Sequence, residues 1–320
     1  MGTAAPPVAR SLEFEPYYPL FGHPDLATIV GRYWPVRLEP GEPRLFPTEP
    51  GVQVLGRCHW RDPRAPVAVL VHGLEGSCDS TYVRWMARAT LDAGFDVVRL
   101  NVRNCGGTEH LAPTLYHSGL TTDLRAVVAQ LAPRRLFLIG FSMGGNQVLK
   151  LAGEWGVSAP PHVAAVCAIS APIDLAACAR RLGEPRNRVY ERHFLRRLAA
   201  SLRRKVRLFP DRFSLAPLAR VRCIIDFDHH ITAPAFGFRD AWDYYEQSSA
   251  LRYLDAVRLP ALLIQARDDP FIPFACYRLP VNAALRLLAP DHGGHVSFLS
   301  RTPPRFWAAR QALRFFQAYA

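Results

Sequence analysis

The chain has 320 residues, of which 49% are hydrophobic and 21% are charged, a composition typical of one large globular domain or two small ones. No uninterrupted apolar stretch approaches the roughly 18 residues needed to span a bilayer, and no apolar segment of signal-peptide type follows Met1. We therefore expect a cytoplasmic protein. Its seven cysteines form no C-x-x-C pair and are odd in number, which argues against a disulfide framework or a zinc site.

The formal net charge is +12, and much of the excess lies in one segment. Between residues 180 and 222 there are fourteen Arg and Lys residues and only three acidic ones. No nucleic-acid-binding motif accompanies them, so we expect no nucleic-acid partner. We interpret the segment as a solvated helical face; a transient contact with an anionic membrane surface, or an anionic substrate, remains the alternative.

The first part of the chain predicts a regular alternation of strands and helices after an irregular start. Residues 1–60 are rich in proline and aromatic residues, which indicates an arm packed on the core, with a weak antiparallel strand or hairpin arm at residues 51–60. Apolar runs predict strands at 67–71, 96–100, 136–139 and 163–169, with helices at 80–92 and 120–131. This order predicts an α/β fold with a mostly parallel, doubly wound sheet.

The alternation stops between residues 172 and 258, where basic helical sequence and a cluster of aromatic residues predict an inserted helical cap. Strands resume at 261–266 and 285–289, and a last helix at 303–320 is expected to close the sheet edge. The chain is thus divided into an arm (1–60), a first core part (61–171), a basic helical cap (172–258) and a second core part (259–320).

The clearest functional pattern is the stretch Gly140-Phe141-Ser142-Met143-Gly144, which joins a buried strand to a helix. The small residues around Ser142 let the strand and the helix approach closely, while a strained backbone projects the serine hydroxyl outward. This is the nucleophile elbow of the α/β-hydrolase fold. We therefore predict Ser142 to be a catalytic nucleophile.

A serine nucleophile needs a neutral imidazole as its base and a buried carboxylate to orient that imidazole. Asp269 follows a late strand and precedes a proline by four residues, so we prefer it as the acid over its neighbour Asp268. His295 follows a pair of glycines in the last loop, and we prefer it over His292 as the base. The order Ser142, Asp269, His295 is the one found in the α/β-hydrolase class.

An oxyanion hole in this fold combines the N–H after the nucleophile with an N–H from a loop after an early strand. These positions are occupied by Met143 and by Leu74 in the loop His72-Gly73-Leu74. His72 is interpreted as a structural histidine of that loop. Tyr116 and His117 are interpreted as a buried pair that anchors a loop, with a place in the active site as the alternative.

Several motifs together resemble one branch of the α/β-hydrolases, the YheT-like esterases related to the mammalian abhydrolase-domain lipases. The matching motifs are Phe14-x-Pro16, Thr28-Ile29, His72-Gly73-Leu74-Glu75-Gly76-Ser77, Asn101-x-Arg103-Asn104-Cys105-Gly106-Gly107-Thr108, Tyr116-His117-Ser118-Gly119 with Asp123-Leu124, Gly140-Phe141-Ser142-Met143-Gly144-Gly145-Asn146, Asp268-Asp269-Pro270-Phe271 and Gly293-Gly294-His295-Val296. They cover nearly the whole chain. Met143 and Ser297 stand where many relatives have Leu and Gly, and the cap is unusually rich in arginine.

The resemblance implies hydrolysis of carboxylic esters, such as acylglycerols or phospholipids, without a metal or another cofactor. Together with the residue pattern it leads us to expect a serine esterase that acts on short to medium acyl esters or acylglycerols through an acyl-enzyme. Two alternatives remain. The same three residues serve an acyltransferase equally well, and a non-catalytic lipid-binding protein is compatible with the same fold.

Overall fold

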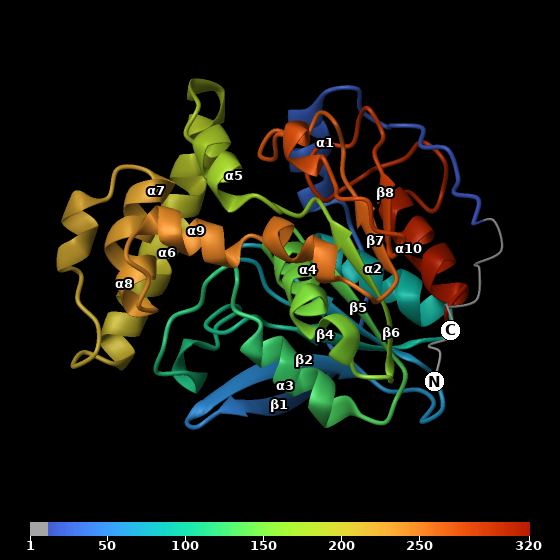
Figure 1. Ribbon diagram of the computed structural model, residues 1–320, viewed down its shortest axis with the longest axis horizontal. Helices are drawn as coiled ribbons and strands as arrows, with labels where there is room; N and C mark the ends of the chain where they lie inside the picture. Colours follow the sequence, from blue (N-terminus) through green and yellow to red (C-terminus); the bar gives the residue numbers. More distant parts are fainter. Residues whose placement is uncertain (1–11) are drawn as a thin grey trace.

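The computed structural model describes residues 12–320, in which helices and strands alternate through most of the chain (Figure 1). The strands are β1 Glu42–Glu49, β2 Val52–His59, β3 Val67–Val71, β4 Asp96–Leu100, β5 Leu136–Phe141, β6 Val163–Ile169, β7 Ala261–Ile264 and β8 Leu285–Leu288. The α-helices are α1 Pro24–Tyr33, α2 Thr81–Asp92, α3 Thr122–Leu131, α4 Met143–Trp155, α5 Leu175–Leu182, α6 Arg188–Leu208, α7 Ile224–Phe227, α8 Ala233–Ala235, α9 Ala241–Ser248 and α10 Trp307–Gln317.

All eight of these strands form one sheet in the order β1-β2-β4-β3-β5-β6-β7-β8. Each neighbouring pair from β4 to β8 is parallel, whereas β1 and β2 join antiparallel at one end. The predicted doubly wound, mostly parallel sheet is therefore confirmed. In such a sheet the carboxyl ends of the parallel strands meet at one edge, where ligands bind.

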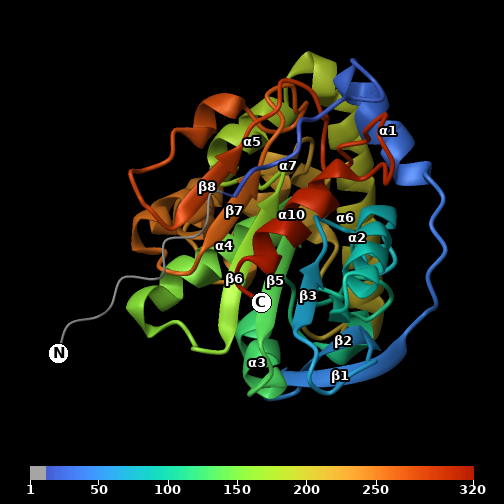
Figure 2. The ribbon, with the colours of Figure 1, turned by 90° about the vertical axis from the view of Figure 1, so that its right-hand side faces the viewer.

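The sheet is covered on both faces, as its sequence pattern requires. Every residue of β3, β4, β5 and β7 is buried, which is typical of parallel strands between two helical layers. Alternate residues of β5 pack into opposite layers: Leu136 and Leu138 pack with α3 and α4, and Phe137 and Ile139 with α2 and α10. Figure 2 shows α10 in front of the strands. Because the predicted strands and helices supply both layers, this core follows directly from the local patterns.

The arm expected at residues 1–60 contains more regular structure than its composition indicates, and the antiparallel strand expected at residues 51–60 is present as β2. Residues 1–11 lie outside the described part of the chain, but residues 24–33 form α1, and residues 42–59 form a hairpin that belongs to the sheet. Pro43 and Pro47 lie in β1, where a proline is tolerated because an edge strand has one side without a partner. These prolines hid the strand from sequence reasoning.

The predicted cap is present as a helical layer beside the sheet, seen at the left of Figure 1. It has its own apolar cluster, to which α5, α6, α7 and α9 contribute. The cap ends earlier than expected, at α9, because the following 3-10 helix η6 (Ala250–Ala256) packs on α4 and joins the main core.

The last helix also differs from its expected place. It was predicted to close the edge of the sheet, but α10 lies over β6 and β7 and against α2, while β8 remains the edge strand. Its buried side chains include Trp307, Phe315 and Phe316, so its apolar stripe covers a face of the sheet.

Candidate active site

Ser142 stands alone in the sharp turn between β5 and α4. Its backbone has φ 51° and ψ −122°, a conformation that is strained for any residue other than glycine. The turn is tight because strand and helix nearly touch: a Cβ on Gly144 would lie 2.4 Å from the carbonyl oxygen of Val71, and a Cβ on Gly140 would lie 2.2 Å from that of Gly144. Glycine is therefore required at both positions, as the elbow pattern implies.

Three of the residues that the sequence singled out lie in one hydrogen-bonded line. The distance from His295 Nε2 to Ser142 Oγ is 2.9 Å, and the distance from His295 Nδ1 to Asp269 Oδ2 is also 2.9 Å. These distances are within the range of direct proton transfer. Ser142 lies more than a hundred positions before Asp269 and His295 in the sequence, so the fold brings the three side chains together.

The two competitors lie elsewhere. His292 is exposed, and its Nδ1 lies 3.2 Å from Asp268 Oδ2, so these two residues pair with each other beside the site. Asp268 also accepts a hydrogen bond of 3.1 Å from the backbone N–H of Gly294. Asp269 and His295 thus form the pair that contacts Ser142, whereas Asp268 and His292 form a second pair beside the loop that contains Gly294.

The Asp269 carboxylate is held on both oxygens. Oδ1 accepts hydrogen bonds from the backbone N–H groups of Phe271 and Ile272, at 2.9 and 3.2 Å, and Oδ2 accepts one from Gln265 at 3.2 Å as well as contacting His295. These three donors fix the orientation of the carboxylate. A carboxylate fixed in this way orients the imidazole and stabilises its charged form.

One supporting residue was missed by sequence reasoning about the site. Thr28, in α1, accepts a hydrogen bond of 2.9 Å from the backbone N–H of His295, which lies 267 positions away in the sequence. The Phe271 ring packs edge-on against the His295 imidazole, with 4.6 Å between ring centroids. No local pattern around Thr28 indicates this role, because the contact exists only once α1 has docked beside the last loop.

The two backbone groups expected to form an oxyanion hole lie next to Ser142. Met143 is the first residue of α4, and Leu74 follows Gly73, whose Cβ would lie only 2.9 Å from Ser142 Cβ. Within residues 12–320, neither the Leu74 N–H nor the Met143 N–H donates a hydrogen bond. Both groups are thus available beside the serine, where a helix N-terminus favours negative charge.

His72 has the structural role expected for it. Its Nδ1 donates to the Gly73 carbonyl at 2.7 Å, and its Nε2 accepts from the backbone N–H of Val102 at 3.0 Å. Burial lowers the pKa of His72 to about 4, so the ring stays neutral at pH 7. The Gly73 N–H in turn donates to the Tyr82 hydroxyl at 3.0 Å, which holds the start of the loop.

Glu75 was not predicted as a site residue, yet it connects the cap to the loop of residues 72–77, called here the oxyanion loop because it contains Leu74. It is buried with φ 54°, and its carboxylate accepts hydrogen bonds of 2.7 Å from the hydroxyls of Tyr116 and Ser201. The Arg197 guanidinium also donates to the Glu75 carbonyl. Ser201 and Arg197 both belong to α6, so one cap helix fixes the residue that follows Leu74.

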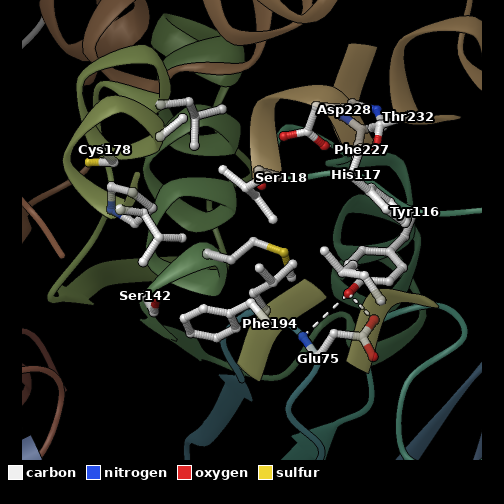
Figure 3. A pocket seen from close by; sticks show the side chains of 18 of the residues that line it. Glu75, Tyr116, His117, Ser118, Ser142, Cys178, Phe194, Phe227, Asp228 and Thr232 are labelled. Atoms are coloured by element: carbon white, nitrogen blue, oxygen red, sulfur yellow. Dashed lines mark hydrogen bonds between the residues drawn. The ribbon is translucent and has the colours of Figure 1, made fainter. Parts of the chain in front are cut away.

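Two cavities meet at Ser142. The inner cavity, about 150 Å³, lies beneath the cap; its wall is mostly apolar and includes Met143, Leu198 and Phe227. Tyr116 and His117 are partly buried and line this cavity, which agrees with the alternative that gave them a place at the site. Figure 3 shows Ser142 on one side of this cavity and Asp228 with Thr232 on the other.

The second cavity, about 650 Å³ and called here the outer cavity, is lined by residues of α1, α6 and the loop 73–77. It shares Leu74, Glu75, Ser142 and His295 with the inner cavity. Because both cavities are lined by Ser142 and His295, a molecule bound at Ser142 can place one part in each cavity.

The described residues were also compared with the requirements of a metal site and of a membrane-spanning helix. Among residues 12–320, no group of three or more His, Cys, Asp and Glu side chains is placed to hold a metal ion, and Asp228 instead accepts hydrogen bonds from Tyr245 and Thr232. Within the same residues, none of the helices combines the length and the apolar character that crossing a bilayer requires.

Comparison with known proteins supports this architecture. The family model described as the alpha/beta hydrolase fold matches residues 66–302. The chain is 35% identical over 254 residues to YheT of Escherichia coli (strain K12), a protein named as an esterase, covering 76% of this chain and 74% of YheT. It is 31% identical over 250 residues to phospholipase ABHD3 of Mus musculus, covering 75% of this chain and 60% of that protein.

Solved structures agree on the fold. An esterase of Pyrococcus furiosus superposes with a TM-score of 0.58 at 18% identity, covering 87% of this chain and 90% of that one. The match to the family model and the identity to YheT both extend over most of the chain. The chain therefore belongs to the α/β-hydrolase family, and it is an enzyme of the esterase and lipase type for which its relatives are named.

Proposed function

We propose that this chain is a serine esterase in which Ser142 attacks the carbonyl carbon of a carboxylic ester. The observation that carries the proposal is the line from Asp269 through His295 to Ser142, with 2.9 Å at each of its two steps. A serine hydroxyl is a weak nucleophile at neutral pH unless an imidazole within hydrogen-bond reach removes its proton. A structural role for all three side chains does not require this alignment.

The reaction follows from these contacts. His295 takes the proton of Ser142 as its oxygen bonds to the carbonyl carbon, and the N–H groups of Leu74 and Met143 hold the oxyanion. His295 then gives the proton to the leaving alcohol as the ester C–O bond breaks, which leaves an acyl-enzyme. Water attacks the acyl group with His295 as its base, and the carboxylic acid is released.

The inner cavity supports an apolar acyl group. Its wall beneath the cap is mostly apolar and includes Leu115, Leu182 and Phe194. An acyl chain buried there removes apolar surface from water on both partners, which favours binding. We therefore infer short to medium acyl esters or acylglycerols as the substrate class.

The cap surface supports a transient contact with an anionic membrane. Five exposed arginines, Arg188, Arg192, Arg196, Arg203 and Arg207, recur along α6 at spacings of four and seven residues. Such spacings place all five on one side of the helix. The ion pairs recorded for this region of the described chain use Arg181 and Arg204 instead, so the row remains available to anionic headgroups.

A cytoplasmic location is part of the same proposal. All seven cysteines are free thiols, and Cys58, Cys78, Cys105 and Cys167 are buried. Free thiols persist in a reducing compartment, whereas secreted proteins commonly carry disulfides.

Labelling with a fluorophosphonate probe tests the proposed nucleophile. We expect the purified wild-type protein to be labelled, and the variants Ser142→Ala and His295→Ala to lose labelling while keeping a wild-type circular dichroism spectrum. Retained labelling of folded Ser142→Ala would refute the assignment. A folded wild-type protein without labelling favours the lipid-binding alternative.

A second assay separates a hydrolase from an acyltransferase. We expect turnover of p-nitrophenyl esters and monoacylglycerols in buffer without any added acceptor alcohol, with the free fatty acid as product. Turnover that requires an acceptor and yields a new ester would instead identify an acyltransferase that uses the same three residues.

A further inference from the structure

The outer cavity differs from the inner one in its charge. Its wall includes Arg32 from α1 and His193 and Arg197 from α6. The Arg32 guanidinium lies 3.2 Å from His193 Nε2, and Arg197 is fixed by its hydrogen bond to the Glu75 carbonyl. Two helices that are far apart in the sequence therefore bring three basic side chains to one side of the reacting serine.

These cations are not neutralised locally. Within residues 12–320, neither Arg32 nor Arg197 forms an ion pair with a carboxylate; their recorded side-chain contacts are to His193 and to the carbonyl of Glu75. Burial lowers the pKa of His193, and the positive charge of the neighbouring arginines lowers this pKa further. This effect of the arginines on the pKa of His193 reflects the positive charge concentrated at this wall.

The two carboxylates of the outer cavity are engaged elsewhere. Asp79 pairs with the buried Arg99, with 2.8 Å between Oδ1 and Nη1. The Glu75 carboxylate accepts hydrogen bonds from the hydroxyls of Tyr116 and Ser201. Neither carboxylate is directed at the basic wall by a recorded contact, so the wall retains the capacity to bind an anion.

The proposed chemistry decides which part of a substrate enters the outer cavity. The leaving alcohol takes its proton from His295, so it must lie on the side of that imidazole. His295 and Leu74 line both cavities, but Val296 and Ser297, which follow His295, line the outer one alone, and Met143 lines the inner one alone. The acyl group accordingly belongs to the inner cavity and the alcohol to the outer one.

We propose that the outer cavity is a binding subsite for an anionic group on the alcohol part of the ester, held by Arg32, His193 and Arg197. The substrate class is thereby narrowed to esters with an apolar acyl chain and an alcohol that carries a phosphate or a carboxylate. This inference rests on the proposed esterase function, because it uses the direction of the ester bond. The arginines supply bidentate donors of the kind that recognise these groups.

Binding to a catalytically inactive variant tests the subsite without using turnover. In the Ser142→Ala background, calorimetry would compare 1-hexanoylglycerol 3-phosphate with 1-hexanoylglycerol, both kept below the concentration at which they aggregate. We expect the phosphate ester to bind at least about tenfold more tightly. Adding Arg32→Ala should reduce the ratio of the two Kd values about fivefold or more, as loss of one partly exposed charge contact implies.

The control is Arg286→Ala in the same background, since this exposed arginine lies in β8, away from the cap and outside both cavities, and the substitution changes the net charge equally. It should leave the ratio of Kd values unchanged. Equal Kd values for the two ligands, or equal effects of the two substitutions, would overturn the subsite. Failure of the esterase proposal would appear separately, as absent fluorophosphonate labelling in the wild-type protein.

The His193→Gln substitution distinguishes a positioned subsite from a general electrostatic field. Glutamine keeps a hydrogen-bonding side chain but cannot become positively charged. We expect it to weaken binding of the phosphate ester more at pH 5.5 than at pH 8, because a bound phosphate beside His193 favours the protonated imidazole and so opposes the lowering of its pKa by burial and by the neighbouring arginines. An effect that is the same at both pH values would exclude a charged His193 from the subsite.

Discussion

Asp268 and Asp269 are neighbours in the sequence but have different surroundings. Asp269 is buried and accepts hydrogen bonds from two backbone N–H groups, Gln265 and His295, whereas Asp268 contacts the exposed His292 and the backbone of Gly294. A carboxylate that orients an imidazole needs such fixed donors. The two residues therefore provide a matched pair for testing the proposed acid.

We expect Asp269→Asn to lower kcat for a p-nitrophenyl ester by roughly 10³- to 10⁴-fold, because an amide in this position favours the wrong tautomer of His295. Asp268→Asn should lower kcat by less than about tenfold, since it keeps an acceptor oxygen for Gly294. Steady-state kinetics of both variants, after confirming equal Tm values, measures the difference. A larger loss in Asp268→Asn would transfer the proposed role to Asp268.

Asp228 is a second informative residue, because it is a carboxyl group buried beside the inner cavity. Burial raises its pKa from 3.8 to about 6, and the hydroxyls of Tyr245 and Thr232, which donate to it, oppose that rise. A carboxyl group with a raised pKa stabilises the fold when it is protonated. This stabilisation is complete below the unfolded-state pKa and is lost as the pH rises through the folded-state pKa.

We expect Asp228→Asn to gain stability relative to the wild-type protein between about pH 4 and pH 7. One pH unit of pKa difference corresponds to about 1.4 kcal/mol, so the relative gain approaches about 3 kcal/mol above pH 7. Urea unfolding of both proteins at several pH values measures it. A difference between the two free energies of unfolding that does not change with pH would contradict the raised pKa.

At the scale of elements, α6 links the cap to the oxyanion loop. Its Ser201 donates to the Glu75 carboxylate, and its Arg197 donates to the Glu75 carbonyl, one residue after Leu74. Glu75 also has φ 54°, so the loop is held in a conformation that it would not favour on its own. The placement of a cap helix thereby influences a backbone group proposed to act on the oxyanion.

Replacing Ser201 by alanine should lower kcat roughly tenfold and change KM little, because a hydrogen bond to a buried carboxylate is worth about 1.5 to 3 kcal/mol and part of that positions the loop. Ser214→Ala is the matched control, since Ser214 is exposed and bonds only to the nearby Ala216 N–H. Kinetics on a soluble ester gives both constants. An increase in KM alone would instead indicate a role in binding the acyl group.

At the scale of the whole molecule, a tightly packed core lies beside a cap that carries a row of exposed arginines. The sheet and its two helical layers bury nearly all of their apolar residues, whereas the row of five arginines on α6 remains exposed. A surface of this kind attracts anionic partners over a distance set by the ionic strength. The cap would bring the active site to an anionic lipid surface.

The double variant Arg192→Gln/Arg196→Gln should bind phosphatidylserine vesicles about thirtyfold more weakly, since each basic residue near such a surface contributes about 1 kcal/mol. Arg278→Gln/Arg286→Gln is the control, because these exposed arginines lie outside the cap near β8. Vesicle flotation at low and physiological salt measures binding. Equal binding of both double variants, or equal binding to neutral phosphatidylcholine vesicles, would refute the membrane contact.

Local sequence patterns were sufficient for much of the core and for the main candidates at the site. Buried parallel strands appear in the sequence as continuous apolar runs, and the helices between them appear as apolar residues repeated every three or four positions. Both patterns can therefore be recognised along the chain. The elbow is equally local, because the contacts that require Gly140 and Gly144 involve the immediate turn and one neighbouring strand. Ser142 was therefore identifiable from five residues.

The tertiary structure decided what depends on contacts between distant segments. Thr28 meets His295 across 267 positions, and Ser201 meets Glu75 across 126, so neither pairing leaves a trace in local periodicity. The first strand of the N-terminal hairpin, β1, was hidden for the same reason, since its prolines are acceptable only at the edge of the sheet; the second strand, β2, lies within the segment 51–60 whose alternation indicated it. Sequence alone determined the buried parallel strands, the turn and the candidate residues, because these are local preferences. Docking of α1 and α6 decided which charges and hydrogen bonds surround the serine, because those depend on packing.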